Sequence, residues 1–279
     1  MKKISRRSFL AAAGLSVAAL ALTACGGSSA STASSVASSA ASSEAASTSA
    51  AAGELTTVEA GKLTMATNAA FPPYEMTTDA GDFEGIDIET AQAIADKLGL
   101  ELQIDDMDFD AALLSVQQGK ADIVMAGVTV TDERKAVMDF SDSYATGIQS
   151  IIVPEGSDIA SPDDLAGKKI GTQRGTTGYI YCSDDFGDDN VVAYDDGLTA
   201  VQALNNGQVD AVVIDNAPAK EFVAANPGLV ILDTSYAEED YAIGMAKGSS
   251  LEDAVNATLE ELKADGTLQA IVDKYITAE

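Results

Sequence analysis

The sequence predicts an α/β fold made of two similar lobes. Short apolar strands alternate with amphipathic helices between residues 62 and 275, an order that indicates parallel sheets covered by helices. In addition, the segment ALLSVQQGKADIVMAGV is echoed by AVQALNNGQVDAVVIDNA. Each runs as a helix, a glycine, two further residues, an aspartate, an apolar strand and a loop of small residues. A repeat of this kind predicts two lobes of similar build that face each other.

In the first half of the folded region strands alternate with helices, and the predicted helices end at glycines. Gly99 and Gly119 each follow the last apolar position of a helical pattern. Pro72 and Pro73 predict an irregular loop, because proline disrupts both helix and sheet. The expected elements are a strand at 62–67, a loop at 68–74, a helix at about 85–98, a strand at 100–104, a helix at 111–118 and a strand at 123–125.

The second half repeats this character. Pro162 suits the first position of a short helix, and Gly266 separates two helices near the end of the chain. The expected elements are a strand at 150–153, a short helix at 161–165, a strand at 168–172, a helix at 198–205, a strand at 209–214, a helix at 217–225, a strand at 229–232 and helices at 251–264 and 268–275.

The corner at 121–141 carries the strongest candidate for a binding residue. A small-residue loop at 126–129 leads to Thr131, which is a good N-cap, and Arg134 falls in the first turn of the next helix. A guanidinium can hold a carboxylate through two parallel hydrogen bonds, and the loop supplies further donors. Taken alone, Arg134 would more often be a surface helix residue paired with an acid.

Two further positions suit a polar ligand. The turn at 173–178 is rich in glycine and threonine and opens a helix, which makes it a natural anion site. Its spacing lacks the nucleotide-binding pattern G-x-x-x-x-G-K-[ST]. Asp215 ends a predicted strand, and it is also placed to cap the helix at 217–225.

Composition excludes several classes of protein. The chain has 279 residues, a formal net charge of −28 and no histidine. Such an acidic chain is a poor binder of nucleic acid. The lack of histidine argues against histidine-based catalysis and most transition-metal sites, so we expect no metal and no cofactor.

The N-terminus has the features of a lipoprotein export signal. Lys2, Lys3, Arg6 and Arg7 precede an apolar stretch at 10–22 that is short for a membrane span. The sequence LTAC then predicts cleavage before Cys25, which would carry the lipid. Residues 1–24 are therefore expected to be a signal peptide. The segment SRRSFL also fits twin-arginine export, so the general secretory and twin-arginine routes both stay open.

Residues 25–57 are expected to form a flexible tether rich in serine and alanine. The chain would then touch the membrane only through the lipid on Cys25. Cys182, the one other cysteine, has no partner in the folded region, so no structural disulfide is expected.

A family resemblance is carried by AGVTVTDERK followed by DFSDSY. These motifs closely resemble the substrate-binding proteins of polar amino acid ABC importers, and the resemblance extends from about 63 to 276. It implies a two-lobed fold of the periplasmic-binding-protein type (type II), with two parallel-sheet lobes joined by a two-strand hinge. Lobe 1 would span 58–146 and be completed by 243–279, and lobe 2 would span 147–242. The chain would cross outward at 144–148 and return at 241–245.

The resemblance also implies a binding site between the lobes. Arg134 would hold the ligand's α-carboxylate, and Asp215 would pair with its α-ammonium, so that each lobe contributes one charge. The loop with Ala126, Gly127 and Thr129 would hold both groups, and the turn with Gln173, Thr176 and Thr177 would complete carboxylate binding. The residues expected around the ligand's side chain are Asn68, Phe71, Tyr74 and Phe109. Any one of these aromatic residues would also fit simple core packing, but Phe71 and Phe109 are expected in loops after strands, where α/β folds bind ligands.

Departures from the family pattern narrow the ligand. Asn68 stands where relatives that bind cationic side chains carry an acid. Ile214 and Gln173 stand where glutamine-binding relatives carry histidine and lysine. A neutral polar, sulfur-containing or apolar side chain is therefore favoured, and Asn68→Asp should shift the preference toward cationic ligands.

The function that the resemblance implies is binding without chemistry. The protein would capture an L-amino acid and deliver it to an ABC permease and its ATPase, as a monomer anchored at Cys25 on the extracytoplasmic side, on the outer face of a Gram-positive cell membrane. One alternative is a ligand-sensing lipoprotein. Another is an enzyme on the same scaffold, similar to cyclohexadienyl dehydratases, for which Glu84 and Asp87 would be the nearest acids. A passive adhesin would leave Arg134 and Asp215 without a role.

Overall fold

The computed structural model describes residues 55–276, all of which lie in one compact unit, Ala50–Glu279. The expected signal peptide, Cys25 and the tether up to residue 54 lie outside the described residues. Leu55, at the end of the expected tether, already packs against the apolar core. No helix among the described residues is long and apolar enough to cross a membrane.

The first lobe is built on a five-stranded sheet in the order β5-β1-β6-β14-β7. Strand β1 runs parallel to both β5 and β6, whereas β14 is antiparallel to β6 and β7. The strands are β1 (Lys62–Thr67), β5 (Glu101–Asp106), β6 (Ile123–Val124), β7 (Met138–Phe140) and β14 (Gly244–Ala246). The helices of this lobe are α1 (Ile86–Leu98), α2 (Phe109–Gln117), α3 (Asp132–Val137), α7 (Glu252–Ala264) and α8 (Thr267–Tyr275).

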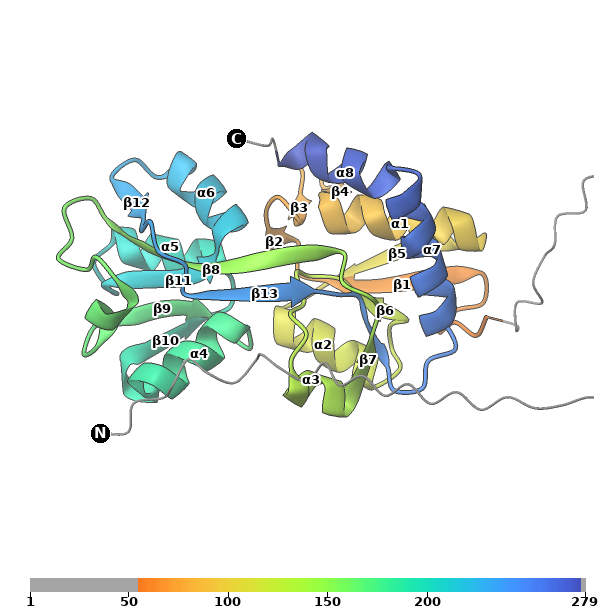
Figure 1. The fold of residues 1–279 in the computed structure, drawn as a ribbon, viewed down its shortest axis with the longest axis horizontal. Helices are drawn as coiled ribbons and strands as arrows, with labels where there is room; N and C mark the ends of the chain where they lie inside the picture. Colours follow the sequence, from red (N-terminus) through yellow and green to blue (C-terminus); the bar gives the residue numbers. More distant parts are fainter. Residues whose placement is uncertain (1–54, 277–279) are drawn as a thin grey trace, which may run out of the picture. The chain divides into compact units, whose positions relative to one another are not determined.

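Helices cover both faces of this sheet. Successive residues of a strand point to opposite faces, so a single strand contributes side chains to both apolar clusters. Leu63 and Met65 belong to the apolar cluster that includes α1, α7 and α8, while Ala66 belongs to the cluster around α2. Figure 1 shows α7 and α8 packed beside α1, which brings the C-terminal part of the chain onto the first lobe.

The second lobe is built on a sheet in the order β10-β9-β11-β8-β12. Its strands are β8 (Ala145–Pro154), β9 (Ile170–Gln173), β10 (Val191–Tyr194), β11 (Ala211–Asp215) and β12 (Leu229–Ile231). Its helices are α4 (Thr177–Phe186), α5 (Gly197–Asn205) and α6 (Asn216–Ala225), with short 3-10 turns η1 (Pro162–Leu165) and η2 (Asp188–Asn190). The sheet is parallel at β10, β9 and β11 but antiparallel around β8.

The sheets are therefore mixed, whereas the sequence predicted parallel ones. The antiparallel pairs all involve strands that enter or leave a lobe or stand at a sheet edge, where the chain does not return through a helical crossover. The two-lobed α/β fold itself is confirmed.

A second correction concerns residues 68–74, which the sequence predicted as an irregular loop. This segment contains β2 (Ala70–Phe71), which pairs antiparallel with β3 (Glu75–Thr77), and β3 pairs in turn with β4 (Phe83–Glu84). Phe71 thus lies in a strand, and Phe109 is the first residue of α2 rather than a loop residue. The turn at the prolines allows this hairpin because Pro72 and Pro73 stand between the strands and not inside them.

Two strands side by side connect the lobes (Figure 1). β8 pairs antiparallel with β13 (Ala237–Tyr241), in a register that sets Ala145 opposite Tyr241 and Gln149 opposite Ala237. After Tyr241 the chain continues into β14 of the first lobe. This arrangement gives the two-strand hinge that the resemblance implied.

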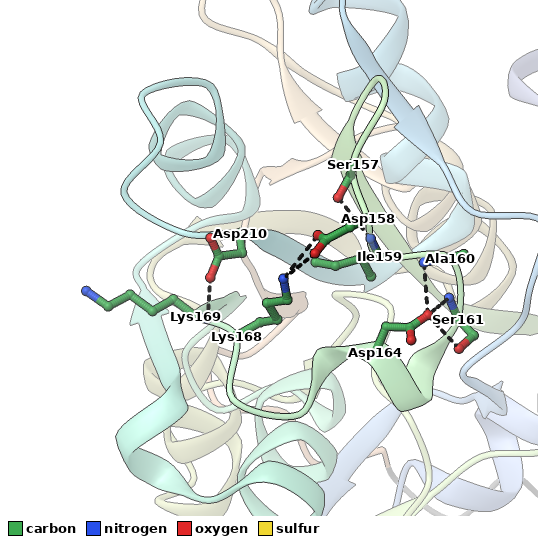
Figure 2. Close-up of polar contacts among 9 residues, drawn as sticks. All are labelled: Ser157, Asp158, Ile159, Ala160, Ser161, Asp164, Lys168, Lys169 and Asp210. Atoms are coloured by element: carbon green, nitrogen blue, oxygen red, sulfur yellow. Dashed lines mark hydrogen bonds and ion pairs between the residues drawn. The ribbon is translucent and has the colours of Figure 1, made fainter.

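The repeat seen in the sequence has the same geometry in both lobes. Asp122, before β6, accepts the backbone N–H groups of Val58 and Thr64, each at 2.7 Å. Asp210, before β11, accepts the backbone N–H of Lys169 at 2.8 Å (Figure 2). In each lobe the aspartate thus ties its own strand to the start of the neighbouring parallel strand. Figure 2 also shows the capping box of Ser161 and Asp164 that begins η1.

Candidate functional site

A narrow cavity of about 20 Å³ lies between the two lobes. Every site residue predicted from the sequence lines it except Tyr74, which packs on Phe71 and Tyr241 and lines a neighbouring cavity beside the hinge. The lining consists of Asn68, Phe71, Glu75, Phe109, Ala126, Gly127, Thr129, Arg134, Gln149, Gln173, Thr176, Thr177, Val213, Ile214 and Asp215.

Arg134 enters the cavity from the first turn of α3. Thr131 caps this helix by accepting the Arg134 backbone N–H at 3.1 Å, as its sequence position predicted. The guanidinium donates from Nη1 to the carbonyl of Thr129 at 2.7 Å, and its carbon stands 5.4 Å from the ring centre of Phe109. The side chain is buried, and burial lowers the pKa of Arg134 from its ordinary value. The cation is therefore held in a water-poor site by a carbonyl dipole and an aromatic face.

The lobes are in contact across the cavity. Arg134 Nη2 of the first lobe donates to the carbonyl of Gly175 in the second at 3.2 Å. Gln173 Nε2 of the second lobe donates to Asn68 Oδ1 of the first at 2.8 Å, and Asn68 Nδ2 donates to the carbonyl of Met107 at 2.9 Å. These bonds fix the orientation of both side-chain amides. The oxygen and the nitrogen of the Asn68 amide are therefore both hydrogen-bonded within the protein.

Asp215 stands at the end of β11 with 7% of its surface exposed. It occupies the N-cap position of α6, but its side chain makes no capping hydrogen bond. Its Oδ2 accepts Gln149 Nε2 at 2.7 Å, while Oδ1 is buried without a hydrogen-bond partner. Burial raises the pKa of Asp215 to about 7, and the negative charge of Glu239 adds to this rise. Half of the carboxylate is thus left for a cationic partner.

Two residues of the hinge strands contribute to the site and were missed from the sequence. Gln149 of β8 and Glu239 of β13 are both buried, and Gln149 Nε2 donates to Glu239 Oε2 at 3.1 Å. The same oxygen accepts the hydroxyls of Thr129 at 3.1 Å and Thr177 at 3.0 Å. A signal for Glu239 existed, because period-two alternation along β13 places it on the same face as Tyr241.

A buried pair of acids beneath the cavity was also missed as part of the site. Glu75 lines the cavity and is fully buried, and its carboxyl group hydrogen-bonds with that of Asp87. Burial, and then the charge of Asp87, raises the pKa of Glu75 well above its ordinary value. Asp87 Oδ2 accepts the backbone N–H of Gly127 at 3.0 Å, and burial raises the pKa of Asp87 to about 6. Asp87 therefore holds the binding loop in place, whereas Glu84 is exposed.

The arrangement suits noncovalent binding of a dipolar molecule. A cation from one lobe and an acid from the other line a single cavity, with aromatic rings and hydroxyls between them. No group of three or more metal-ligating side chains is arranged to hold a metal ion among residues 55–276.

Comparisons with known proteins agree with this geometry. Residues 63–278 match the family model described as bacterial extracellular solute-binding proteins, family 3. The chain is 33% identical over 226 residues to the L-cystine-binding protein TcyJ of Escherichia coli K12, covering 79% of this chain and 85% of that protein.

Two solved structures are similar across both lobes. An ancestral arginine-binding protein bound to glutamine gives a TM-score of 0.75 at 41% identity, covering 78% of this chain and 99% of the other. The arginine-, lysine-, histidine-binding protein ArtJ from Geobacillus stearothermophilus gives 0.75 at 34% identity, covering 78% and 96%. These relatives are named as binding proteins and not as enzymes. The chain belongs to the bacterial extracellular solute-binding proteins of family 3.

Proposed function

We infer that the protein is the extracytoplasmic binding component of an ABC importer for an L-amino acid. It captures the amino acid between its lobes by hinge closure and delivers it to a membrane permease with its ATPase. The observation that carries this proposal is the placement of Arg134 and Asp215. One comes from each lobe, both are buried, and both line the same cavity.

In this proposal the ligand's carboxylate binds at Arg134 and its ammonium binds at Asp215. The carboxylate takes the place of a carbonyl partner of the guanidinium, with help from the loop at 126–129 and from Thr176 and Thr177 at the start of α4. The ammonium pairs with the carboxylate of Asp215, whose Oδ1 has no other hydrogen bond. Since each charge of the ligand binds to a different lobe, binding favours the closed arrangement.

The cellular setting is inferred from the N-terminal sequence. Residues 1–24 act as the signal peptide, Cys25 carries the lipid, and the residues from 25 up to Leu55, which packs against the apolar core, form the tether to the outer face of a Gram-positive cell membrane. The folded part works as a monomer, with lobe 1 at 58–146 and 243–279 and lobe 2 at 147–242. A ligand-sensing role would use the same cavity, and loss of amino acid uptake on deletion of the gene would favour transport over sensing.

The class of the ligand's side chain rests on two sets of residues. Asn68 and Gln173 present neutral amides, which favours the neutral polar, sulfur-containing or apolar side chain expected from the sequence. A second candidate, a cationic side chain, is favoured by Glu75, an acid that lines the cavity beside Asp87. Relatives named for cystine and for arginine, lysine and histidine fit one candidate each.

A thermal-shift screen of the purified protein against the proteinogenic amino acids and cystine tests the proposal. A ligand that binds only the folded state raises the unfolding midpoint, by about 2.7 kcal/mol of stability at a hundredfold excess over Kd. We expect a shift with one or a few L-amino acids and none for Arg134→Ala. Lys135→Ala, an exposed neighbour on the same helix, should keep the shift.

The identity of the shifting ligand decides between the two side-chain classes. A shift with neutral or sulfur-containing amino acids supports the first class, and a shift with arginine or lysine supports the second. A protein that shifts with no amino acid, or only with acids lacking the α-amino group, contradicts the role given to Asp215.

A further inference from the structure

We propose that Glu239 is the positioning residue that couples closure of the cavity to the hinge. It lies on β13, and its carboxylate is shared by a hydroxyl from each lobe and by an amide from the other hinge strand. This coupling rests on the proposed function and deepens it, because the same contacts hold the residues that would bind the amino acid.

The strand itself directs Glu239 inward. Along β13, Glu238 and Asp240 are exposed, whereas Glu239 has 6% of its surface exposed and faces Gly147 of β8 in the register. A charged side chain in such a place is costly unless donors surround it. Three hydrogen bonds to Oε2 meet that requirement for one oxygen, while Oε1 is buried without a hydrogen-bond partner.

Glu239 Oε2 is a common acceptor for three parts of the molecule. Thr129 donates its hydroxyl from the first lobe at 3.1 Å, and Thr177 donates its hydroxyl from the second lobe at 3.0 Å. Gln149 donates from the hinge strand β8 at 3.1 Å. The two hydroxyl oxygens lie only 3.4 Å apart. Separation of the lobes must therefore break at least one of these bonds, since both threonines cannot stay on one oxygen.

Two of these donor residues also contact a charged residue of the site, and the third is the first residue of a helix that opens at the cavity. The carbonyl of Thr129 accepts Arg134 Nη1 at 2.7 Å, and Gln149 Nε2 also donates to Asp215 Oδ2 at 2.7 Å. Thr177 is the first residue of α4. Burial lowers the pKa of Arg134, and the negative charge of Glu239 opposes that lowering. Glu239 thus acts through its neighbours on both ends of the expected clamp.

The population of molecules whose lobes are in contact can be measured with a pair of cysteines, one on each lobe. A Cβ built on Gly175, whose φ is 76°, lies 3.2 Å from Cβ of Asp110, slightly inside the roughly 3.5–4.5 Å separation of a disulfide. In the ligand-free protein carrying Asp110→Cys and Gly175→Cys, the rate of disulfide formation should follow the closed population. Glu239→Ala in this background should slow the rate about tenfold, which corresponds to the loss of about one charge-assisted hydrogen bond.

Two further variants keep the test specific. Glu239→Gln retains an acceptor oxygen and should restore the rate to within about threefold. Glu238→Ala removes an exposed acid from the same strand and should leave the rate unchanged. An unchanged rate in Glu239→Ala, an equal loss in Glu238→Ala, or no cross-linking of the parent pair would each overturn the proposal.

A ligand, once found, gives a second and independent arm. Without the added cysteines, Glu239→Ala should raise the dissociation rate about tenfold with little change in the association rate, because closure follows encounter. An equal effect on both rates would contradict the coupling. Failure of the proposed function appears differently, as no binding by any variant while the cross-linking differences remain.

Discussion

The two lobes contain the same repeated unit, yet they give the site opposite charges. In both, a helix ends at a glycine in the left-handed conformation, Gly119 or Gly207, and an aspartate then ties its strand to the neighbouring strand. The units diverge where the strand ends. In the first lobe β6 leads into a loop and then to Arg134, whereas in the second lobe β11 ends directly on Asp215. The scaffold is therefore shared, and the few residues after each strand determine the charge.

The two ends of the site also differ in how completely they are satisfied. Arg134 donates to two backbone carbonyls and faces an aromatic ring, so its charge is supported within the protein. Asp215 has one bonded and one unbonded oxygen, and its neighbour Glu239 is also an acid. The anionic end is thus held at a cost in stability, and a ligand's ammonium would remove that cost. Four predictions test these differences between the two lobes and between the parts of the site.

The largest expected effect is a fall in the stability of the ligand-free protein as pH rises. The folded pKa of Asp215, about 7, lies above its ordinary value of 3.8. The neutral form is favoured by folding, so its contribution is fully present below about pH 3.8 and is lost as pH rises through 7. The loss approaches about 4 kcal/mol across this window, at about 1.36 kcal/mol per pH unit.

Glu75 and Asp87 act in the same direction, since their pKa values are also raised. Urea unfolding between pH 4 and 8 measures the slope, and Asp215→Asn should make it shallower. Stability that rises over this range, or an unchanged slope in Asp215→Asn, would show that the anionic end carries no such cost.

The next effect compares the two aspartates of the repeat. Asp122→Ala removes a buried acceptor of two backbone N–H groups and should lower the free energy of unfolding by about 3 kcal/mol. Asp210→Ala removes one bond from an exposed carboxylate and should cost below about 1 kcal/mol. Denaturant midpoints measure both losses. Equal losses would contradict the prediction that the aspartate of the first lobe stabilises its unit more than the aspartate of the second.

A smaller effect is expected from the hinge glycine beside Asp215. A Cβ on Gly147 would lie 2.5 Å from the Tyr241 hydroxyl oxygen and 2.6 Å from Asp215 Oδ1. Gly147→Ala should displace the carboxylate and weaken amino acid binding about tenfold, or about 1.4 kcal/mol. Calorimetric titration measures the affinity. Gly156→Ala, in a loop that does not line the cavity, adds a methyl group in open space at a φ of 80°, so it strains its own loop and should leave the affinity unchanged.

The smallest effect concerns the side-chain end of the cavity. Asn68→Asp adds a negative charge where the amide of Gln173 donates, and it should shift competition toward cationic amino acids by about threefold to tenfold. Selectivity that stays the same in a competition assay would place the ligand's side chain away from Asn68.

Much of the fold could be predicted because its signals are local. The boundaries of β1 and α1, the cap at Thr131 and the repeat around Asp122 and Asp210 all follow from periodicity and capping within a few residues. The mixed sheets could not, since the direction of β8 and β14 depends on how the chain leaves and re-enters a lobe. The strand at Phe71 depends on a hairpin with β3 that two prolines obscured.

The candidate site shows the same division. The motif AGVTVTDERK is readable along the chain, and its Gly127 and Arg134 line the cavity. Glu75 and Gln149 have no local signal for binding, because their position depends on strand pairings between distant segments. Alternation along β13 places Glu239 on a buried face, but its partners depend on such pairings too. Glu239, for example, bonds to Thr129, 110 residues earlier in the chain.

The most direct test of the central claim is a calorimetric titration of the wild-type protein and Asp215→Asn, each with the identified amino acid and with its analogue lacking the α-amino group. If Arg134 and Asp215 hold opposite ends of the ligand, removal of the amino group should weaken wild-type binding by about a hundredfold. In Asp215→Asn, which already binds weakly, the same removal should add little. Equal losses in both proteins would contradict the pairing of Asp215 with the ammonium, and with it the account of one charge from each lobe.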